Sequence, residues 1–211
     1  MNIDSFAYSL KYRSPLLFDA LQRGTIWVTV LRHSAARRRA LDRAPVQGTI
    51  GGVPAQVRPL WPTDAGELYR FLDRIPDEYL HYFRPHDFSP GGICRTIRSY
   101  AHCCYGLFVN EVLSGYALIK LFPTGRAYCG LLRSPGIGRR GVGRFLWRYL
   151  IWQCALMEVT PCATVHEENL ASLGSLHSIK PATRQSSLAG NHLRLVIPVT
   201  DADRLPPELQ L

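Results

Sequence analysis

The stretch GIGRRGVGRFLWRYL, residues 136–150, combines a glycine-rich turn, adjacent arginines and an apolar run. It follows a segment with the composition of a β-strand, and the apolar run predicts a helix that begins near Val142. Glycines let the main chain approach a bulky anion, and the first turn of a helix leaves its N–H groups without intrahelical partners. With the helix dipole and the arginines, these groups favour phosphate binding over a tight turn that is basic by chance.

The composition is that of a globular chain with excess positive charge. The 211 residues are 46% hydrophobic and 19% charged, with a formal net charge of +9. Residues 1–55 hold eight Lys or Arg and three Asp, and no acidic residue lies between Glu111 and Glu158. Such a field attracts polyanions. No apolar run reaches the roughly 20 residues that span a bilayer, and the amino terminus lacks a signal-peptide core, so we expect a cytoplasmic protein.

The six cysteines follow no C-x-x-C spacing and lie mostly beside aromatic or aliphatic residues. This pattern favours reduced thiols in the core over a disulfide framework or a zinc site, and we expect no metal centre. Cys103 and Cys104 are adjacent, so one thiol is expected on each face of a strand.

A cluster of Gly and Pro in VQGTIGGVPA (46–55) predicts a boundary between an N-terminal extension and the main domain. We therefore divide the chain into an extension of unknown role (1–55), a domain (56–200) and a tail (201–211). In the extension, GTIWVTVLR (24–32) has the β-branched content of a strand and SAARRRALDRA (34–44) has helix formers. The Arg37–Arg39 triplet is interpreted as a solvated helix face, because a nucleic-acid patch would have interleaved aromatics.

After residue 55 the hydrophobic pattern alternates between strand and helix periods. Asp64 and Glu67 have capping-box spacing at the start of the first helix. Hairpin strands in the middle and crossovers at the end imply a mixed sheet with helices on its faces. The predicted strands cover 56–61, 103–110, 114–122, 127–133, 159–166 and 192–199, and the predicted helices 62–75, 76–83, 93–101, 142–157 and 167–179.

The glycine-rich stretch fits two other phosphate-binding motifs less well. The segment GIGRRG (136–141) matches the dinucleotide pattern Gly-x-Gly-x-x-Gly, but hairpin strands precede its strand, and Glu158 is the sole acidic residue near the expected spacing. No Lys-Ser or Lys-Thr follows the glycines, so the P-loop pattern is absent. Dinucleotide binding stays the weaker alternative.

Three segments in order resemble the GCN5-related N-acetyltransferase (GNAT) superfamily: VRPLWPTDAGELYRFLD (57–73), GRRGVG (138–143) and ENLASLGSLHSIK (168–180). The resemblance implies an α/β (α+β) fold with a mixed, mostly antiparallel, splayed β-sheet flanked by helices. It also implies an acetyl-CoA-dependent N-acetyltransferase that acts on a primary amine of a small molecule, such as an amino sugar or sugar nucleotide, or of a peptide. A degenerate module that binds acyl-CoA as a sensor or scaffold is the alternative, and a homodimer is left open.

The resemblance also implies which residues bind acetyl-CoA. The strand end at Leu131, Leu132 and Arg133 would hydrogen-bond the pantetheine through main-chain groups. Asn169 would contact the pantetheine arm, and Ser172 on the same helix is a further candidate. The pyrophosphate would lie on the helix start, at Gly138, Arg139, Arg140, Gly141, Val142, Gly143 and Arg144.

The resemblance leaves the usual proton donor without a counterpart in this sequence. The tyrosine that often protonates the departing thiolate in this family falls on Leu176, which cannot donate a proton. His177 is next to that position, and His166 and Glu167 lie at a strand end suited to deprotonating an amine, although each also fits a surface role. The segment HYFRPHDF (81–88) matches the substrate-recognition region, with candidates His81, Tyr82, His86 and Asp87, or is a loop packed by its own aromatics.

Overall fold

The computed structural model describes residues 15–137, 141–188 and 190–211. Within these residues, nine strands form one sheet in the order β7-β8-β6-β5-β4-β3-β2-β1-β9. Neighbouring strands are antiparallel except for the parallel pairs β5–β6 and β1–β9. The predicted α/β fold with a mixed, mostly antiparallel sheet is therefore confirmed. No helix in the described part of the chain is long and apolar enough to cross a membrane.

From residue 56 onward, every predicted helix and strand is present in the predicted order, with small shifts of the bounds, and the structure adds the strands β7 and β9. The strands are β1 (Val46–Ile50), β2 (Val53–Pro59), β3 (His102–Val109), β4 (Val112–Leu121), β5 (Arg126–Arg133), β6 (Thr160–His166), β7 (Thr183–Leu188), β8 (His192–Val196) and β9 (Leu209–Gln210). The α-helices are α2 (Pro15–Arg43), α3 (Ala65–Asp73), α4 (Asp77–Leu80), α5 (Pro90–Arg98), α6 (Val142–Leu156) and α7 (Leu170–His177).

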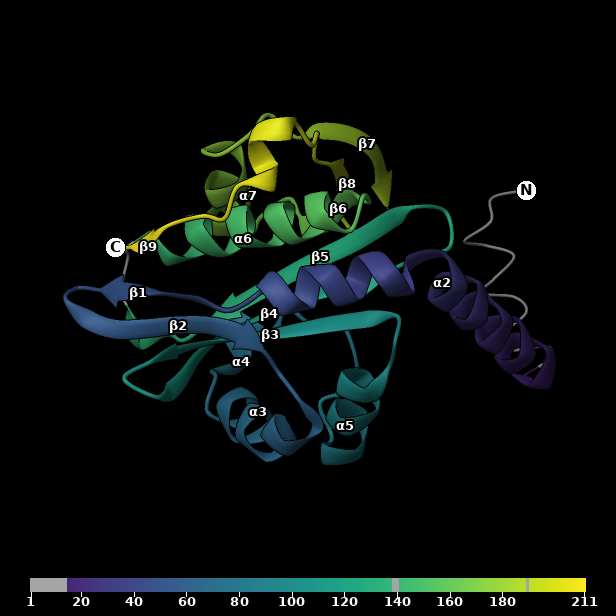
Figure 1. The fold of residues 1–211 in the computed structure, drawn as a ribbon, viewed down its shortest axis with the longest axis horizontal. Helices are drawn as coiled ribbons and strands as arrows, with labels where there is room; N and C mark the ends of the chain where they lie inside the picture. The colour runs from purple at the N-terminus through teal and green to yellow at the C-terminus, as the bar shows by residue number, and fades with distance from the viewer. Residues whose placement is uncertain (1–14, 138–140, 189) are drawn as a thin grey trace.

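Helices cover both faces of the sheet (Figure 1). Helices α6 and α7 lie on one face, and α3, α4 and α5 lie on the other. Each face has its own buried cluster: Trp147 and Leu150 of α6 belong to the first, and Leu68 and Phe71 of α3 to the second. Cys103 packs in the first cluster and Cys104 in the second, which confirms that the two adjacent thiols point to opposite faces.

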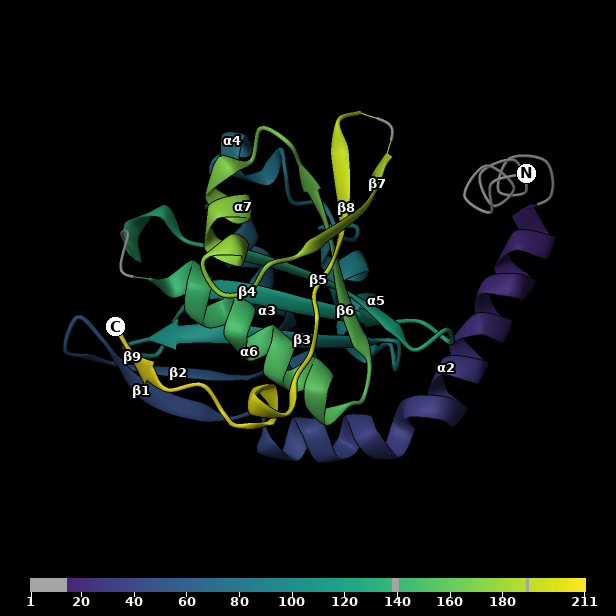
Figure 2. The same ribbon diagram turned by 90° about the horizontal axis from the view of Figure 1, so that it is seen from above.

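The N-terminal extension corrects one prediction. Residues 24–32 are helical and continue into the predicted helix 34–44 as part of α2, instead of forming a strand. Tertiary contacts explain the difference, because Thr29, His33 and Ala40 at helical spacing bury one side of α2 against the body. The other side exposes Trp27 and Leu31. The first half of α2 extends beyond the sheet, as Figure 2 shows.

The predicted boundary at residue 55 lies inside the sheet and is corrected. Residues 46–55 belong to the hairpin of β1 and β2, because Gly51 and Gly52, at φ of 60° and 79°, make the two-residue turn between these strands. The predicted tail 201–211 also joins the sheet, since β9 pairs with β1. The three-part division thus does not follow the sheet, and the role of residues 1–55 stays open.

Asp64 acts differently from the predicted capping box. Its carboxylate accepts two 2.9 Å hydrogen bonds from the Arg58 guanidinium and a 2.7 Å bond from the Trp61 N–H. The bond from Arg58 is the main reason that the pKa of Asp64 is lowered. Glu67 accepts a hydrogen bond from the Leu113 N–H instead of capping α3. Asp64 therefore joins the end of β2 to the start of α3.

Candidate functional site

The sheet opens between β5 and β6. These strands pair over three residues only, from Arg126–Thr160 to Tyr128–Cys162. Beyond that point β5 continues beside β4, while β6 continues beside β8. The facing edges of β5 and β6 therefore diverge, which is the splay that the predicted fold required.

A cavity of about 960 Å³ fills this opening. Leu131 to Arg133 of β5 and Val165 of β6 line it. Residues from α6 and α7 form part of the wall, and so do Tyr79 and Tyr82 from α4 and the residues after it. Because α6 and α7 lie on one face of the sheet and α4 on the other (Figure 1), the cavity passes through the sheet.

The start of α6 borders the cavity with Gly141, Val142, Gly143 and Arg144. Gly141 is the N-cap and has a φ of 78°, a left-handed conformation that glycine adopts at little cost. It has no side chain to cap the helix, so the first N–H groups of α6 stay available to an anion. Gly138, Arg139 and Arg140 were predicted in the same group and lie outside the described residues.

Gly143 has a role in helix packing, in addition to any contact with phosphate. A Cβ at this position would lie 3.1 Å from Ser175 Oγ of α7, closer than most packed carbon atoms lie to a neighbour. The absence of a side chain therefore lets α6 and α7 approach each other where both line the cavity. Close helix packing is a reason for glycine here that the motif alone does not reveal.

Helix α7 contributes small polar residues to the cavity wall. Asn169 is its N-cap, and Asn169 Oδ1 accepts the Ser172 N–H at 3.1 Å, so both predicted residues line the cavity and also start the helix. Ser175, which also lines the cavity, donates from its hydroxyl to the Ala171 carbonyl at 2.8 Å. Leu176, at the position of the family tyrosine, is fully buried in the core.

His166 lies beside the cavity wall and holds two residues that line it. Its ring lies 5.3 Å from that of Tyr82 and 5.0 Å from that of His192, measured between centroids. His166 Nδ1 accepts a 3.2 Å hydrogen bond from the Glu168 N–H. Tyr82 and Glu168 line the cavity, whereas His166 itself does not. His166 is therefore suited to positioning these two side chains.

Two other predicted catalytic residues lie away from the cavity. Glu167 follows β6 and is exposed, and its N–H donates to the Asn191 carbonyl at 2.9 Å. His177 ends α7 and is exposed. Neither residue lines the cavity, so the fold brings neither one to the opening between β5 and β6.

The predicted substrate loop divides into two parts. Tyr82 lines the cavity, and His81 stacks on it with ring centroids 4.8 Å apart. His86 instead contacts the hydroxyl of the buried Tyr116 through Nε2 at 2.9 Å, and burial lowers the pKa of this histidine. The His86 ring also packs edge-on against Phe88, in agreement with a loop packed by its own aromatics.

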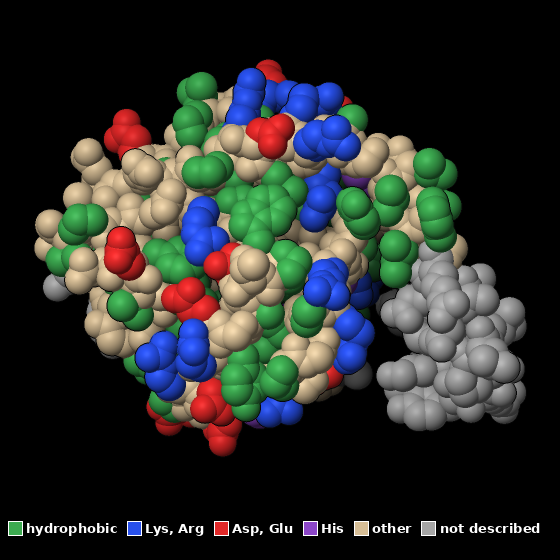
Figure 3. Space-filling view, turned by 60° about the horizontal axis from the view of Figure 1, so that its bottom comes forward, with side chains coloured by type: hydrophobic (Ala, Val, Ile, Leu, Met, Phe, Trp, Pro, Cys, Tyr) green, Lys and Arg blue, Asp and Glu red, His purple; other side chains and the backbone are tan. Residues whose placement is uncertain are grey.

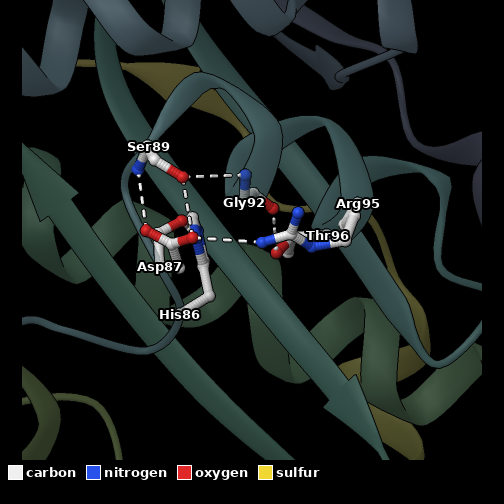
Figure 4. Close-up of polar contacts among 6 residues, drawn as sticks. All are labelled: His86, Asp87, Ser89, Gly92, Arg95 and Thr96. Atoms are coloured by element: carbon white, nitrogen blue, oxygen red, sulfur yellow. Dashed lines mark hydrogen bonds and ion pairs between the residues drawn. The ribbon is translucent and has the colours of Figure 1, made fainter.

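Asp87 organises the start of α5 (Figure 4). Its carboxylate accepts hydrogen bonds from the Ser89 N–H at 2.9 Å and the Ser89 hydroxyl at 2.7 Å, and it pairs with Arg95 at 3.1 Å. The bond from the Ser89 backbone is the main cause that lowers the pKa of Asp87. Ser89 Oγ in turn accepts the Gly92 N–H and caps the helix. Asp87 and His86 therefore stabilise the loop and lie outside the cavity lining.

Several lining residues were not among the candidates from the sequence. Glu78 and Tyr79 come from the short helix α4, Glu168 from the turn after β6, and Trp147 from the second turn of α6. Glu168 was signalled by its position beside Asn169. Glu78 and Tyr79 carried no local signal, because only the packing of α4 below the sheet brings them to the opening.

No protein-family model and no curated protein sequence matches the chain. Solved structures do match it. The GNAT domain of S. lividans PAT is 17% identical with a TM-score of 0.64, over 72% of this chain and 96% of that one. Ribosomal-protein-S5-alanine acetyltransferase from Vibrio fischeri is 14% identical with a TM-score of 0.60, over 76% and 100%.

RimJ from Mycobacterium smegmatis, solved in complex with CoA-disulfide, is 17% identical with a TM-score of 0.57, over 78% of this chain and 90% of that one. The similarity covers nearly the whole length of each of these three proteins. At such low identities the likeness establishes the fold. The chain has the GNAT fold, as the three sequence segments indicated.

Proposed function

We propose that this protein is an acetyl-CoA-dependent N-acetyltransferase that transfers the acetyl group to a primary amine. The observation that supports it most is the cavity through the sheet between β5 and β6, bordered by the uncapped start of α6, in a chain with the GNAT fold. One neighbour with this fold was solved with a coenzyme A derivative bound.

The donor half of the proposed site is the strand edge of β5 together with the start of α6. Main-chain groups of Leu131 to Arg133 that face the opening have no strand beside them and are available to the amides of the pantetheine. The N–H groups of Val142, Gly143 and Arg144 would hold the pyrophosphate, because helix N-termini favour anions. Asn169 and Ser172 lie on the same cavity wall and would contact the pantetheine arm.

The reaction needs a neutral amine and stabilisation of the charge that develops on the thioester oxygen. The amine nitrogen bonds to the acetyl carbon, the carbon–sulfur bond breaks, and the amine proton leaves to solvent or to the thiolate. A free thiol has a pKa of about 8.5, so the departing thiolate is stable enough to leave without a general acid. Leu176 therefore does not exclude catalysis, although it removes the usual proton donor.

We assign His166 a positioning role in this reaction, through its contacts with Tyr82 and Glu168. A His166→Ala variant is expected to raise KM for the amine and to leave the Kd for acetyl-CoA unchanged. The roles of Glu167 and His177 stay predictions, as do a cytoplasmic location and a homodimer.

A sensor or scaffold that binds acyl-CoA without turnover is the second candidate, and one observation favours it. The residue at the position of the family tyrosine is a leucine that is 0% exposed and belongs to the core. Such a side chain neither reaches the cavity nor donates a proton.

Two measurements separate these functions. Calorimetry with acetyl-CoA tests the donor site, and an assay of free thiol released from acetyl-CoA tests turnover across a panel of primary amines. Binding with sustained thiol release supports the enzyme, whereas tight binding without release by any amine supports the sensor. Absence of acetyl-CoA binding to the folded chain would overturn both proposals.

A further inference from the structure

An aromatic ring fills the space that the missing side chain of Gly130 leaves beside β5. Gly130 lies two residues past Tyr128, the last residue of β5 that pairs with β6. A Cβ at Gly130 would lie 3.1 Å from Cε2 of Phe83, so the Phe83 ring packs directly on the main chain of β5. Both residues line the cavity. The ring is therefore part of the cavity wall at the point where the sheet begins to open.

Neighbouring side chains hold the Phe83 ring in this position. Phe83 is 9% exposed and belongs to the second buried cluster. The ring of the buried Tyr116 contacts it edge-on, with centroids 6.0 Å apart and planes at 87°, and the Phe88 ring packs at 6.4 Å. The Tyr116 hydroxyl is itself fixed, because it lies 2.9 Å from His86 Nε2. A ring with these contacts cannot move aside without disturbing the packing around it.

The outer surface on this side of the molecule is polar. Acidic and basic side chains are interspersed around α3 and α5, as Figure 3 shows. The second buried cluster, which includes Phe83, lies between these helices and the sheet. A shorter side chain at position 83 would therefore leave an apolar space inside the protein, next to the cavity.

The direction of β5 determines which end of the donor reaches the ring. The strand runs from the paired residue Tyr128 to Arg133, and α6 begins beyond the Arg133 end (Figure 2). With the pyrophosphate on the start of α6, the pantetheine would follow β5 in the reverse direction, from Arg133 towards Gly130. Its thioester end would then lie where β5 and β6 meet. The acyl group is therefore expected beside Gly130 and the Phe83 ring.

We infer that Phe83 limits the acyl group of the donor to a short chain, so that the protein transfers acetyl in preference to longer acyl groups. This inference rests on the proposed acetyltransferase function. In the reaction, R–NH2 and acyl-CoA give the N-acyl amide and coenzyme A, with the amine proton balancing the thiol. A longer acyl chain would have to enter the space that the ring occupies, and such overpacking costs free energy.

A series of donors with one acceptor amine tests this limit in the unsubstituted protein. Acetyl-CoA, propionyl-CoA, butyryl-CoA and hexanoyl-CoA differ only in the length of the acyl group. A single methylene group in an apolar pocket changes kcat/KM by about tenfold to 200-fold, so we expect at least about a tenfold decrease from acetyl-CoA to butyryl-CoA. Hexanoyl-CoA should react more slowly still. Release of free thiol measures each rate.

A variant with a smaller side chain and a matched control test the ring itself. Phe83→Leu keeps the site apolar and should raise kcat/KM for butyryl-CoA relative to acetyl-CoA about tenfold. Phe88→Leu makes the same change in a ring that packs on Phe83 and does not line the cavity. The control should keep the donor preference of the unsubstituted protein. Coenzyme A without an acyl group should bind both variants with the same Kd.

A methyl group at Gly130 tests the same wall from the side of the strand. In the double variant Phe83→Leu with Gly130→Ala, the added Cβ refills part of the space that the shorter side chain leaves. This variant should therefore lose part of the gain in kcat/KM for butyryl-CoA. Retention of the full gain would contradict the placement of the acyl group beside Gly130.

The outcomes separate this inference from the proposed function. If acetyl-CoA and butyryl-CoA react equally well in the unsubstituted protein, the inference is wrong and the proposed function stands. An unchanged donor preference in Phe83→Leu would also overturn it. If the donors bind without turnover, equal Kd values for all four would overturn it as well. If no donor binds, the proposed function fails and the inference fails with it.

Discussion

Replacement of Gly141 by alanine tests the anion site at the start of α6. Gly141 has a φ of 78°, and a Cβ there would lie 3.4 Å from Leu211 Cδ2 and 3.5 Å from Arg144 Nη2, which are ordinary contacts. The cost of Gly141→Ala is therefore one of backbone conformation. Holding an L-residue in the left-handed region costs about 1–2 kcal/mol.

Gly52→Ala is the matched control for this cost. Gly52 has a φ of 79°, and a Cβ there would meet nothing within 4 Å. It lies in the β1–β2 turn and does not line the cavity. In both variants the free energy of unfolding should fall by the same amount, about 1–2 kcal/mol. In a chain of this size, this loss lowers Tm by about 2–8 °C.

The two variants should differ in their affinity for acetyl-CoA. A hydrogen bond to a charged group contributes about 1.5–3 kcal/mol, so misalignment of one amide at the start of α6 should raise Kd at least about tenfold. Gly52→Ala should keep the Kd of the unsubstituted protein. Calorimetry with acetyl-CoA at a temperature well below Tm measures both, and equal Kd values for the two variants would refute the assignment of the phosphate site to Gly141.

Three further predictions concern stability. Asp64→Asn should lower the free energy of unfolding by about 1 kcal/mol at pH 7, because it breaks the pair with Arg58. The pKa of Asp64 is lowered in the folded protein, so this difference should shrink as the pH falls below 3.8 and vanish once the folded carboxyl is also protonated. Burial lowers the pKa of His102 to about 4, so on acidification the unfolded chain binds a proton before the folded protein does. The free energy of unfolding should therefore fall by up to about 3 kcal/mol between pH 6.5 and pH 4. The decrease should be smaller in His102→Asn. Tyr149→Phe should cost about 1–2 kcal/mol, since it removes the 2.7 Å bond to the Ala44 carbonyl.

Urea unfolding at several pH values measures all three effects. A difference between Asp64→Asn and the unsubstituted protein that does not shrink as the pH is lowered from 3.8 would contradict the ion-pair argument. The His102 prediction fails if both proteins lose equal stability between pH 6.5 and 4. For Tyr149→Phe, an unchanged midpoint at pH 7 would show that the bond to the Ala44 carbonyl, just after α2, contributes no net stability.

Local sequence patterns predicted most of the fold after residue 55. Turns with glycine and the change from strand to helix period are properties of neighbouring residues, so they can be recognised without tertiary information. The segment 24–32 was misassigned because its β-branched residues favour a strand locally, while burial of Thr29 and His33 against the body favours a helix. The pairing of β9 with β1 joins distant parts of the chain and had no local signal.

The same distinction applies to the candidate site. The donor half was predicted because its glycines, arginines and amides belong to one strand–turn–helix unit. The rest of the cavity wall was found only in part, since Tyr82 was a candidate but Glu78 and Glu168 were not. Their place in the wall depends on how α4 packs below the sheet and where β6 turns away from β5. His86 and Asp87 had suitable chemistry, yet they stabilise the loop.

Because β5 and β6 diverge, the second half of β5 has an unpaired edge in the middle of the sheet. When no ligand is bound, amides of Gly130 to Arg133 that point into the opening should exchange hydrogen with solvent faster than those bonded to β4. A ligand with its own amide groups can dock there in the manner of an added strand. When such a ligand binds, the backbone amides of alternate β5 residues should exchange hydrogen more slowly. This two-residue period would show which residues of β5 contact the ligand.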